Sequence, residues 1–168
     1  MSSKISVRDA IVEHFDTLID DATGKRHFWD YFLLYLMPIA GGILVAWIPV
    51  NLKSVGDIIA GVSILTALLF GLIIYVFQLR LQVAADPRIV RGGVLMTLLD
   101  QLFANLIYAV IIGLGATVLA VSASASADSD GSINPWWSAL VVTAGSHLVL
   151  TILMCLKRTR DAYAQLTI

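Results

Sequence analysis

Four long apolar runs, separated by short polar segments, dominate the chain. They cover residues 31–50, 58–79, 94–122 and 136–156, and only the third contains a charged residue. A helix needs about 20 residues to cross the hydrocarbon core of a bilayer. Lipid offers no partner to an unpaired backbone N–H or C=O group, so spanning segments of this kind are helical. The pattern predicts an all-α polytopic membrane protein with four transmembrane helices.

The polar segments set the expected domain organisation. Residues 1–30 form an N-terminal cytoplasmic segment, residues 31–156 the transmembrane domain, and residues 157–168 a cytoplasmic tail. Because the connections between the runs are short, helices that follow each other in the sequence are expected to be antiparallel neighbours. The connection between the third and fourth runs is small and polar, and it is expected to be mobile.

Composition agrees with a membrane protein and excludes several other classes. The chain is 58% hydrophobic and 14% charged, with a mean hydropathy of +0.86, whereas a soluble domain is about 45–50% apolar. A single cysteine, Cys155, excludes an intrachain disulfide. The sequence has no nucleophile motif, metal-ligand cluster, phosphate loop or basic groove. We therefore expect no enzyme activity, no metal or other cofactor, and no direct nucleic-acid binding.

The positive charges predict an orientation. Ten of the eleven Lys and Arg residues precede the first run, lie between the second and third, or follow the fourth, and only Lys53 lies on the other side. The positive-inside rule then places both termini in the cytoplasm, and we expect an inner-membrane protein. Trp29, Trp47 and the pair Trp136-Trp137 fall at the ends of runs, as in an aromatic interfacial belt.

Polar side chains recur every three or four residues inside two of the runs, which places them on one helical face in each. The third run carries Thr97, Gln101, Asn105 and Tyr108 on this face, with Asp100 at its border, and the fourth run carries Thr143, His147 and Thr151. Asn105 and His147 should lie at similar depth on adjacent helices. Because lipid cannot solvate them, the two faces are expected to meet each other or a protein partner.

Structural and functional interpretations of these polar residues are both open. Gln101, Asn105, Thr143 and Thr151 suit interhelical hydrogen bonds. Asp100 suits an ion pair with Arg80 or Arg91, a protonated acid, or a conducting or gating group. His147 suits a neutral structural histidine, or a pore or sensor residue. Because four helices offer little interior, we expect a homo-oligomer to bury these groups.

The N-terminal segment predicts a cytoplasmic amphipathic helix over residues 7–21. Its apolar stripe consists of Val7, Ile11, Phe15, Leu18 and Ile19, and the rest of its surface is acidic. An acidic face is repelled by the anionic inner leaflet. The stripe is therefore expected to pack on the bundle itself, on a sister subunit, or on a cytoplasmic protein partner.

The plan of residues 31–168 resembles small four-helix bacterial membrane proteins of anti-phage systems, such as the membrane subunit of the Kiwa system and the membrane partner in lambda Rex exclusion. The resemblance lies in the stretch "SILTALLFGLIIYVFQLRLQ", the basic loop after it, the polar third helix, and the ending "LVLTILMCLKRTRDAYAQL". It implies a membrane sensor or effector that works with a cytoplasmic partner. The alternatives are a passive anchor or scaffold, and a small channel or transporter.

Overall fold

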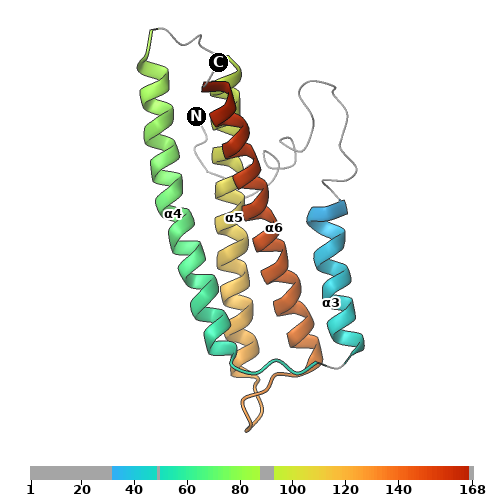
Figure 1. The fold of residues 1–168 in the computed structure, drawn as a ribbon. Helices are drawn as coiled ribbons and strands as arrows, with labels where there is room; N and C mark the ends of the chain where they lie inside the picture. Colours follow the sequence, from blue (N-terminus) through green and yellow to red (C-terminus); the bar gives the residue numbers. More distant parts are fainter. Residues whose placement is uncertain (1–31, 49, 88–92, 167–168) are drawn as a thin grey trace, which may run out of the picture.

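The computed structural model describes residues 32–48, 50–87 and 93–166. In these ranges the chain is helical and contains no strand. The elements are η1, a short π-helix at Phe32–Leu36, then α3 at Met37–Trp47, α4 at Val55–Ala85, α5 at Val94–Ala125 and α6 at Pro135–Leu166 (Figure 1). The all-α prediction is confirmed for this part of the chain.

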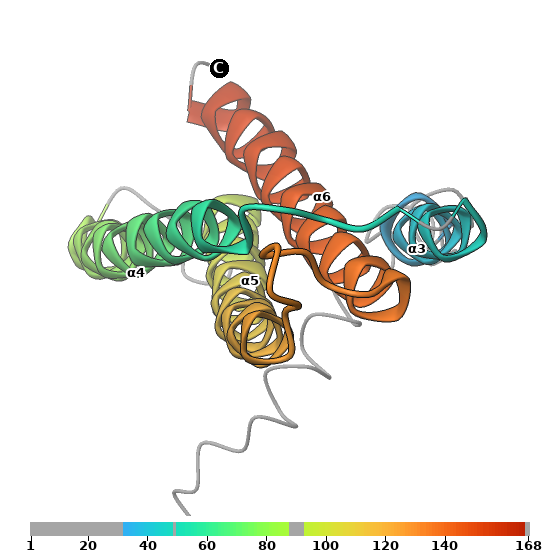
Figure 2. The same cartoon turned by 90° about the horizontal axis from the view of Figure 1, so that it is seen from below.

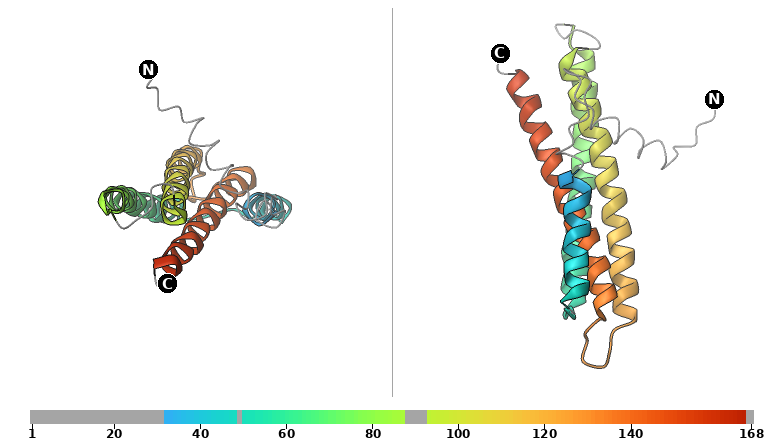
Figure 3. Two further views of the ribbon diagram at one scale, coloured as in Figure 1. Left: turned by 90° about the horizontal axis from the view of Figure 1, so that it is seen from above. Right: turned by 90° about the vertical axis from the view of Figure 1, so that its right-hand side faces the viewer.

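Three of the helices are long and apolar enough to cross a membrane: α4, α5 and the Pro135–Lys157 part of α6. The fourth apolar segment, η1 with α3, is shorter and covers Phe32–Trp47. At 1.5 Å per residue these 16 residues rise about 24 Å, less than a hydrocarbon core of about 30 Å. Figure 3 shows that η1 ends well short of the upper ends of α4 and α5. The chain is thus a membrane-integrated helical protein.

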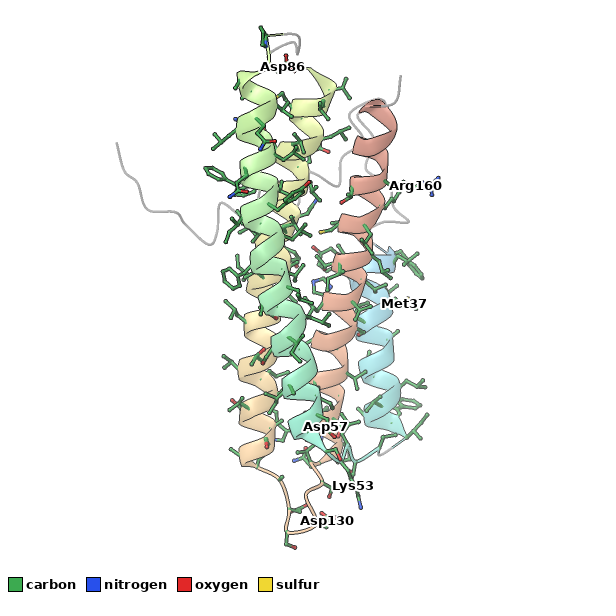
Figure 4. The ribbon with its side chains drawn as sticks, turned by 60° about the vertical axis from the view of Figure 1, so that its left-hand side comes forward. Met37, Lys53, Asp57, Asp86, Asp130 and Arg160 are labelled. Carbon is green, nitrogen blue, oxygen red and sulfur yellow. The ribbon has the colours of Figure 1, made fainter. Side chains whose placement is uncertain are left out.

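The surface of the described part matches a lipid environment. Large apolar side chains are exposed along α3 and α4, among them Ile43, Leu44, Ile64 and Leu68. Figure 4 places the labelled charged residues Lys53, Asp57 and Asp130 near one end of the molecule and Asp86 near the other. An apolar belt between two charged ends is the arrangement that a bilayer requires.

The helices form an open row in the order α4, α5, α6, α3 (Figure 2). The central pair α5 and α6 pack against each other, α4 packs on α5, and α3 packs on α6. The expectation that sequential helices are neighbours is therefore wrong for α3 and α4. Their connection, residues 48–54, crosses the end of α6 instead, as Figure 2 shows.

Close helix contacts at two glycines hold the row together. A Cβ atom on Gly113 of α5 would lie 3.2 Å from the Cβ of Thr66 on α4, and one on Gly42 of α3 would lie 3.0 Å from the carbonyl oxygen of Ala139 on α6. A side chain at either position would force its neighbour to shift. Small residues at such points let membrane helices approach closely enough for dispersion forces to bind them.

Hydrogen bonds join the α3–α4 and α5–α6 connections, which lie at the same end of the bundle. Leu52, between α3 and α4, accepts a bond from the N–H of Ile133 at 3.0 Å and donates one to Ser138 Oγ at 3.1 Å. Lys53 lies 3.5 Å from Asp130 in the α5–α6 connection. Ile133 and Ser138 have no exposed surface. These contacts connect the α5–α6 connection to the neighbouring loop and to α6.

Candidate functional site at His147

The polar faces of α5 and α6 meet at a tyrosine and a histidine. The hydroxyl of Tyr108 lies 2.9 Å from His147 Nε2, and the two rings stand edge to face with centroids 5.9 Å apart. His147 is twelve residues after Pro135, which places it about 18 Å along α6 from the start of that helix, near the middle of a bilayer core. The sequence therefore predicted the meeting of the two faces, although with Asn105 opposite the histidine.

The other side of the histidine ring holds the first apolar segment. His147 Nδ1 lies 2.9 Å from the carbonyl oxygen of Leu34 in η1, and the Tyr35 ring centroid lies 5.2 Å from that of His147. A carbonyl oxygen only accepts hydrogen bonds, so Nδ1 must carry a hydrogen and donate it. One imidazole thus joins three helical elements: η1, α5 and α6.

Pro38 explains why the Leu34 carbonyl accepts a bond from another helix. In a continuous α-helix the N–H of residue 38 donates to the carbonyl of residue 34. Proline has no N–H, and its ring crowds that carbonyl. The backbone widens into the π-turn of η1 just before α3, and His147 donates to the Leu34 carbonyl. Membrane helices tolerate proline when a neighbouring helix satisfies the freed group in this way.

The other polar residues predicted on α5 and α6 are buried or half-buried or bond within their own helix. Thr151 and Thr143 donate to carbonyl oxygens of α6 itself, those of His147 at 2.9 Å and Ala139 at 2.8 Å. Asn105 and Thr151 have no exposed surface, and Gln101 is half-buried. A single chain therefore buries the central polar groups, and burial of these groups no longer argues for an oligomer.

Asp100 belongs to a separate contact near the other end of the bundle. Its carboxylate accepts two bonds from Arg80 of α4, with Nε to Oδ1 at 2.6 Å and Nη2 to Oδ2 at 3.2 Å. The side chains are 42% and 53% exposed, so the pair lies at the surface of the α4–α5 contact. Asp100 is eight residues from Tyr108 and does not take part in the His147 contacts described here.

No group of three or more His, Cys, Asp or Glu side chains in the described residues could hold a metal ion. The predicted docking stripe of residues 7–19 lies outside those residues, as does Arg91, the alternative partner of Asp100. The chemistry that the structure brings together is therefore a hydrogen-bonded histidine inside a membrane helix bundle.

Comparisons with protein-family models, curated proteins and solved structures found no match to this chain. The resemblance to anti-phage membrane proteins thus stays a hypothesis.

Proposed function

We propose that this chain is a bacterial inner-membrane sensor or effector that acts through a movement of η1 and α3 against α6. The observation that carries the proposal is the bond from His147 to the Leu34 carbonyl. An ionisable side chain at this depth is costly, and such residues commonly mark the working parts of membrane proteins.

The position of α3 at one end of the row lets it move with the loss of a single helix interface. Its contacts with the other helices are to η1 and α6, so a shift of α3 disturbs one interface, whereas a shift of α5 would disturb two. The segment 1–31 joins η1 directly, and by the positive-inside rule it is cytoplasmic. A movement of η1 would therefore reach the cytoplasmic side.

The close packing of the bundle interior favours a rearrangement of helices over a permanent pore. Leu106, Leu148, Asn105 and Thr151 of α5 and α6 are almost completely buried in the bundle. An ion leak through this chain would first require the helices to separate. We therefore favour an effector that opens or signals on stimulation over a standing channel or transporter.

Homo-oligomerisation is part of the proposal, with α4 as the contacting helix. Ser63 and Gln78 are exposed on α4, and their separation of fifteen residues places them within about 60° on the helix. Polar side chains facing lipid are better accommodated against another helix. Native mass spectrometry of the nanodisc-extracted protein should give an oligomer that Gln78→Leu weakens, while the lipid-facing control Leu68→Ala does not. A wild-type monomer would remove this part of the proposal.

A cytoplasmic partner is proposed for the apolar stripe of residues 7–19. Phe15→Asp should abolish recovery of the partner while the protein still inserts. An unchanged set of co-purified proteins would remove the partner from the account.

A cellular experiment tests the main proposal. Bacteria with and without the protein are challenged with phage while a voltage-sensitive dye reports membrane potential. We expect depolarisation and reduced plaque formation only in cells that carry the protein. His147→Leu should lose both effects at equal membrane abundance, whereas Leu68→Ala, on the exposed face of α4, should keep them.

A passive anchor is the competing function, because the His147 bonds are also what a purely structural contact requires. An anchor predicts that His147→Leu behaves like the wild type once it is inserted. Equal potential and plaque counts in cells with and without the protein would reject the sensor or effector proposal.

A further inference from the structure

The bonds at His147 fit one charge state of its ring. Nδ1 donates to the Leu34 carbonyl. In a neutral imidazole the other nitrogen, Nε2, is then a bare acceptor. The Tyr108 hydroxyl, 2.9 Å away, donates to it. The neutral ring with its hydrogen on Nδ1 therefore has a matched partner at each nitrogen.

A second ring proton would disturb this match. Nε2 would become a donor and would face a hydroxyl that is already donating, so Tyr108 would have to turn its own hydrogen away. The ring would also carry a positive charge among membrane helices, where a charge is costly unless it is paired. In the charged ring Nδ1 keeps its hydrogen and its bond to Leu34. Protonation therefore acts on the η1–α6 contact through the cost of burying the charge.

Neither helical element beside the ring supplies an acid to pair with an imidazolium. Residues 32–47 of η1 and α3 contain no charged residue, and residues 135–156 of α6 contain none apart from the histidine. The titratable groups that touch the ring are the phenols of Tyr35 and Tyr108, and neither is a carboxylate.

The acids of α4 and α5 are also unsuited to this task. Asp100, the only acid in α5, is two helical turns from Tyr108 and is paired with Arg80. Asp57, the only acid in α4, lies in the first turn of that helix, at its outer end. A protonated His147 would therefore gain most by reaching water or lipid headgroups.

We propose that His147 is a proton-sensitive latch that holds η1 on α6 when neutral and releases it when protonated. Release of the latch would trigger the movement of η1 and α3, so this inference rests on the proposed function. The released state favours the charged ring, so a fall in pH shifts the chain toward release.

The pivot of this movement is Pro38. Since residue 38 has no N–H, the turn that contains Leu34 lacks one of the bonds that would tie it to α3. The outer part of α3 stays in place because Gly42 fits closely against Ala139 and Thr143 of α6. We expect η1 to swing while the Gly42 contact remains closed.

Distance measurements in the full chain test the latch. In a Cys155→Ala background, spin labels are attached at Leu33 of η1 and Leu153 of α6, which are 50% and 53% exposed, and the protein is placed in nanodiscs. A control pair at Ile43 and Leu140 reports on the Gly42 contact. Between about pH 8 and about pH 5 the first distance should lengthen or broaden, and the control distance should not.

Two variants assign the change to the histidine. His147→Gln keeps a donor and an acceptor but cannot be protonated, so its η1–α6 distance should stay short at both pH values. Tyr108→Phe removes the bond that favours the neutral ring, so roughly fivefold more protein should be released at a given mildly acidic pH.

Either of two results would overturn the latch: a wild-type distance that is the same at both pH values, or release in His147→Gln equal to that in the wild type. The distance measurements test the latch, and the cellular experiment tests the proposed function, so the two can fail independently. Release without any cellular effect would keep the latch and reject the sensor proposal. A cellular effect without release would keep the sensor proposal and reject the latch.

Discussion

The link between Pro38 and His147 makes a quantitative prediction for a double-mutant cycle. His147→Leu removes the partner of the Leu34 carbonyl and that of the Tyr108 hydroxyl, both at 2.9 Å. Interhelical hydrogen bonds in membranes contribute about 0.6–1.7 kcal/mol each, so the substitution should cost about 1–3 kcal/mol. In Pro38→Ala, residue 38 regains an N–H that can serve the Leu34 carbonyl. The same histidine substitution should then cost about 1 kcal/mol less.

The assay is reversible unfolding of the full chain in mixed detergent and dodecyl sulfate micelles, followed by tryptophan fluorescence. Tyr108→Phe is the matched control, because the bond it removes does not involve Leu34. Its cost should be the same in the wild-type chain and in the Pro38→Ala background. The reasoning is refuted if the costs of Pro38→Ala and His147→Leu simply add, since the proline would then have no energetic connection to the histidine.

Three further predictions concern other parts of the described chain. Gly113→Leu should destabilise the protein by about 1–3 kcal/mol through overpacking of the α4–α5 contact, whereas Gly115→Leu, which has open space around its Cβ position, should be near neutral in the same unfolding assay. Asp100→Asn should cost less than about 1 kcal/mol there, because exposed ion pairs contribute little; a loss of several kcal/mol would show that Asp100 has a larger role. The hydroxyl and N–H of Ser132 lower the pKa of Asp130 below its usual value, so the stabilisation of this loop is present above about pH 4 and is lost as the pH falls below it. Protection of the Ser132 N–H from hydrogen exchange, corrected for the intrinsic rate, should fall over that range, and in Asp130→Ala it should be low throughout; pH-independent protection in the wild type would contradict the assignment.

The helices themselves were predictable because lipid leaves the backbone few alternatives. Each apolar run contains a helix in the described part of the chain, and the polar spacing on α5 and α6 placed Tyr108 and His147 on facing sides. Both signals are periodic patterns of apolar or polar residues, and such patterns can be recognised in a single sequence.

The order of the helices was not predictable from apolar patterning. Lipid-facing helix surfaces are alike, so the choice of neighbour depends on close contacts such as Gly42 against Thr143. The connection of residues 48–54 can extend to about 23 Å, enough to pass a helix about 10 Å wide. A short loop thus did not force α3 and α4 together.

The contact of His147 with Leu34 and the contacts of Leu52 were difficult to predict from the sequence. The bond between His147 and the Leu34 carbonyl could have been suspected from Pro38, since a proline in a membrane helix frees the carbonyl four residues earlier. The bonds of Leu52 with Ile133 and Ser138 join irregular segments, and no spacing rule indicates such partners.

The protonation state of the His147 ring in a bilayer tests the central claim most directly. Nitrogen-15 NMR of histidine-labelled full-length protein, with the signal assigned by its loss in His147→Gln, distinguishes the two neutral tautomers and the charged ring. At neutral pH the account predicts a neutral ring with its hydrogen on Nδ1 and a bare Nε2. A ring protonated on Nε2, or one averaging freely between tautomers in water, would contradict it.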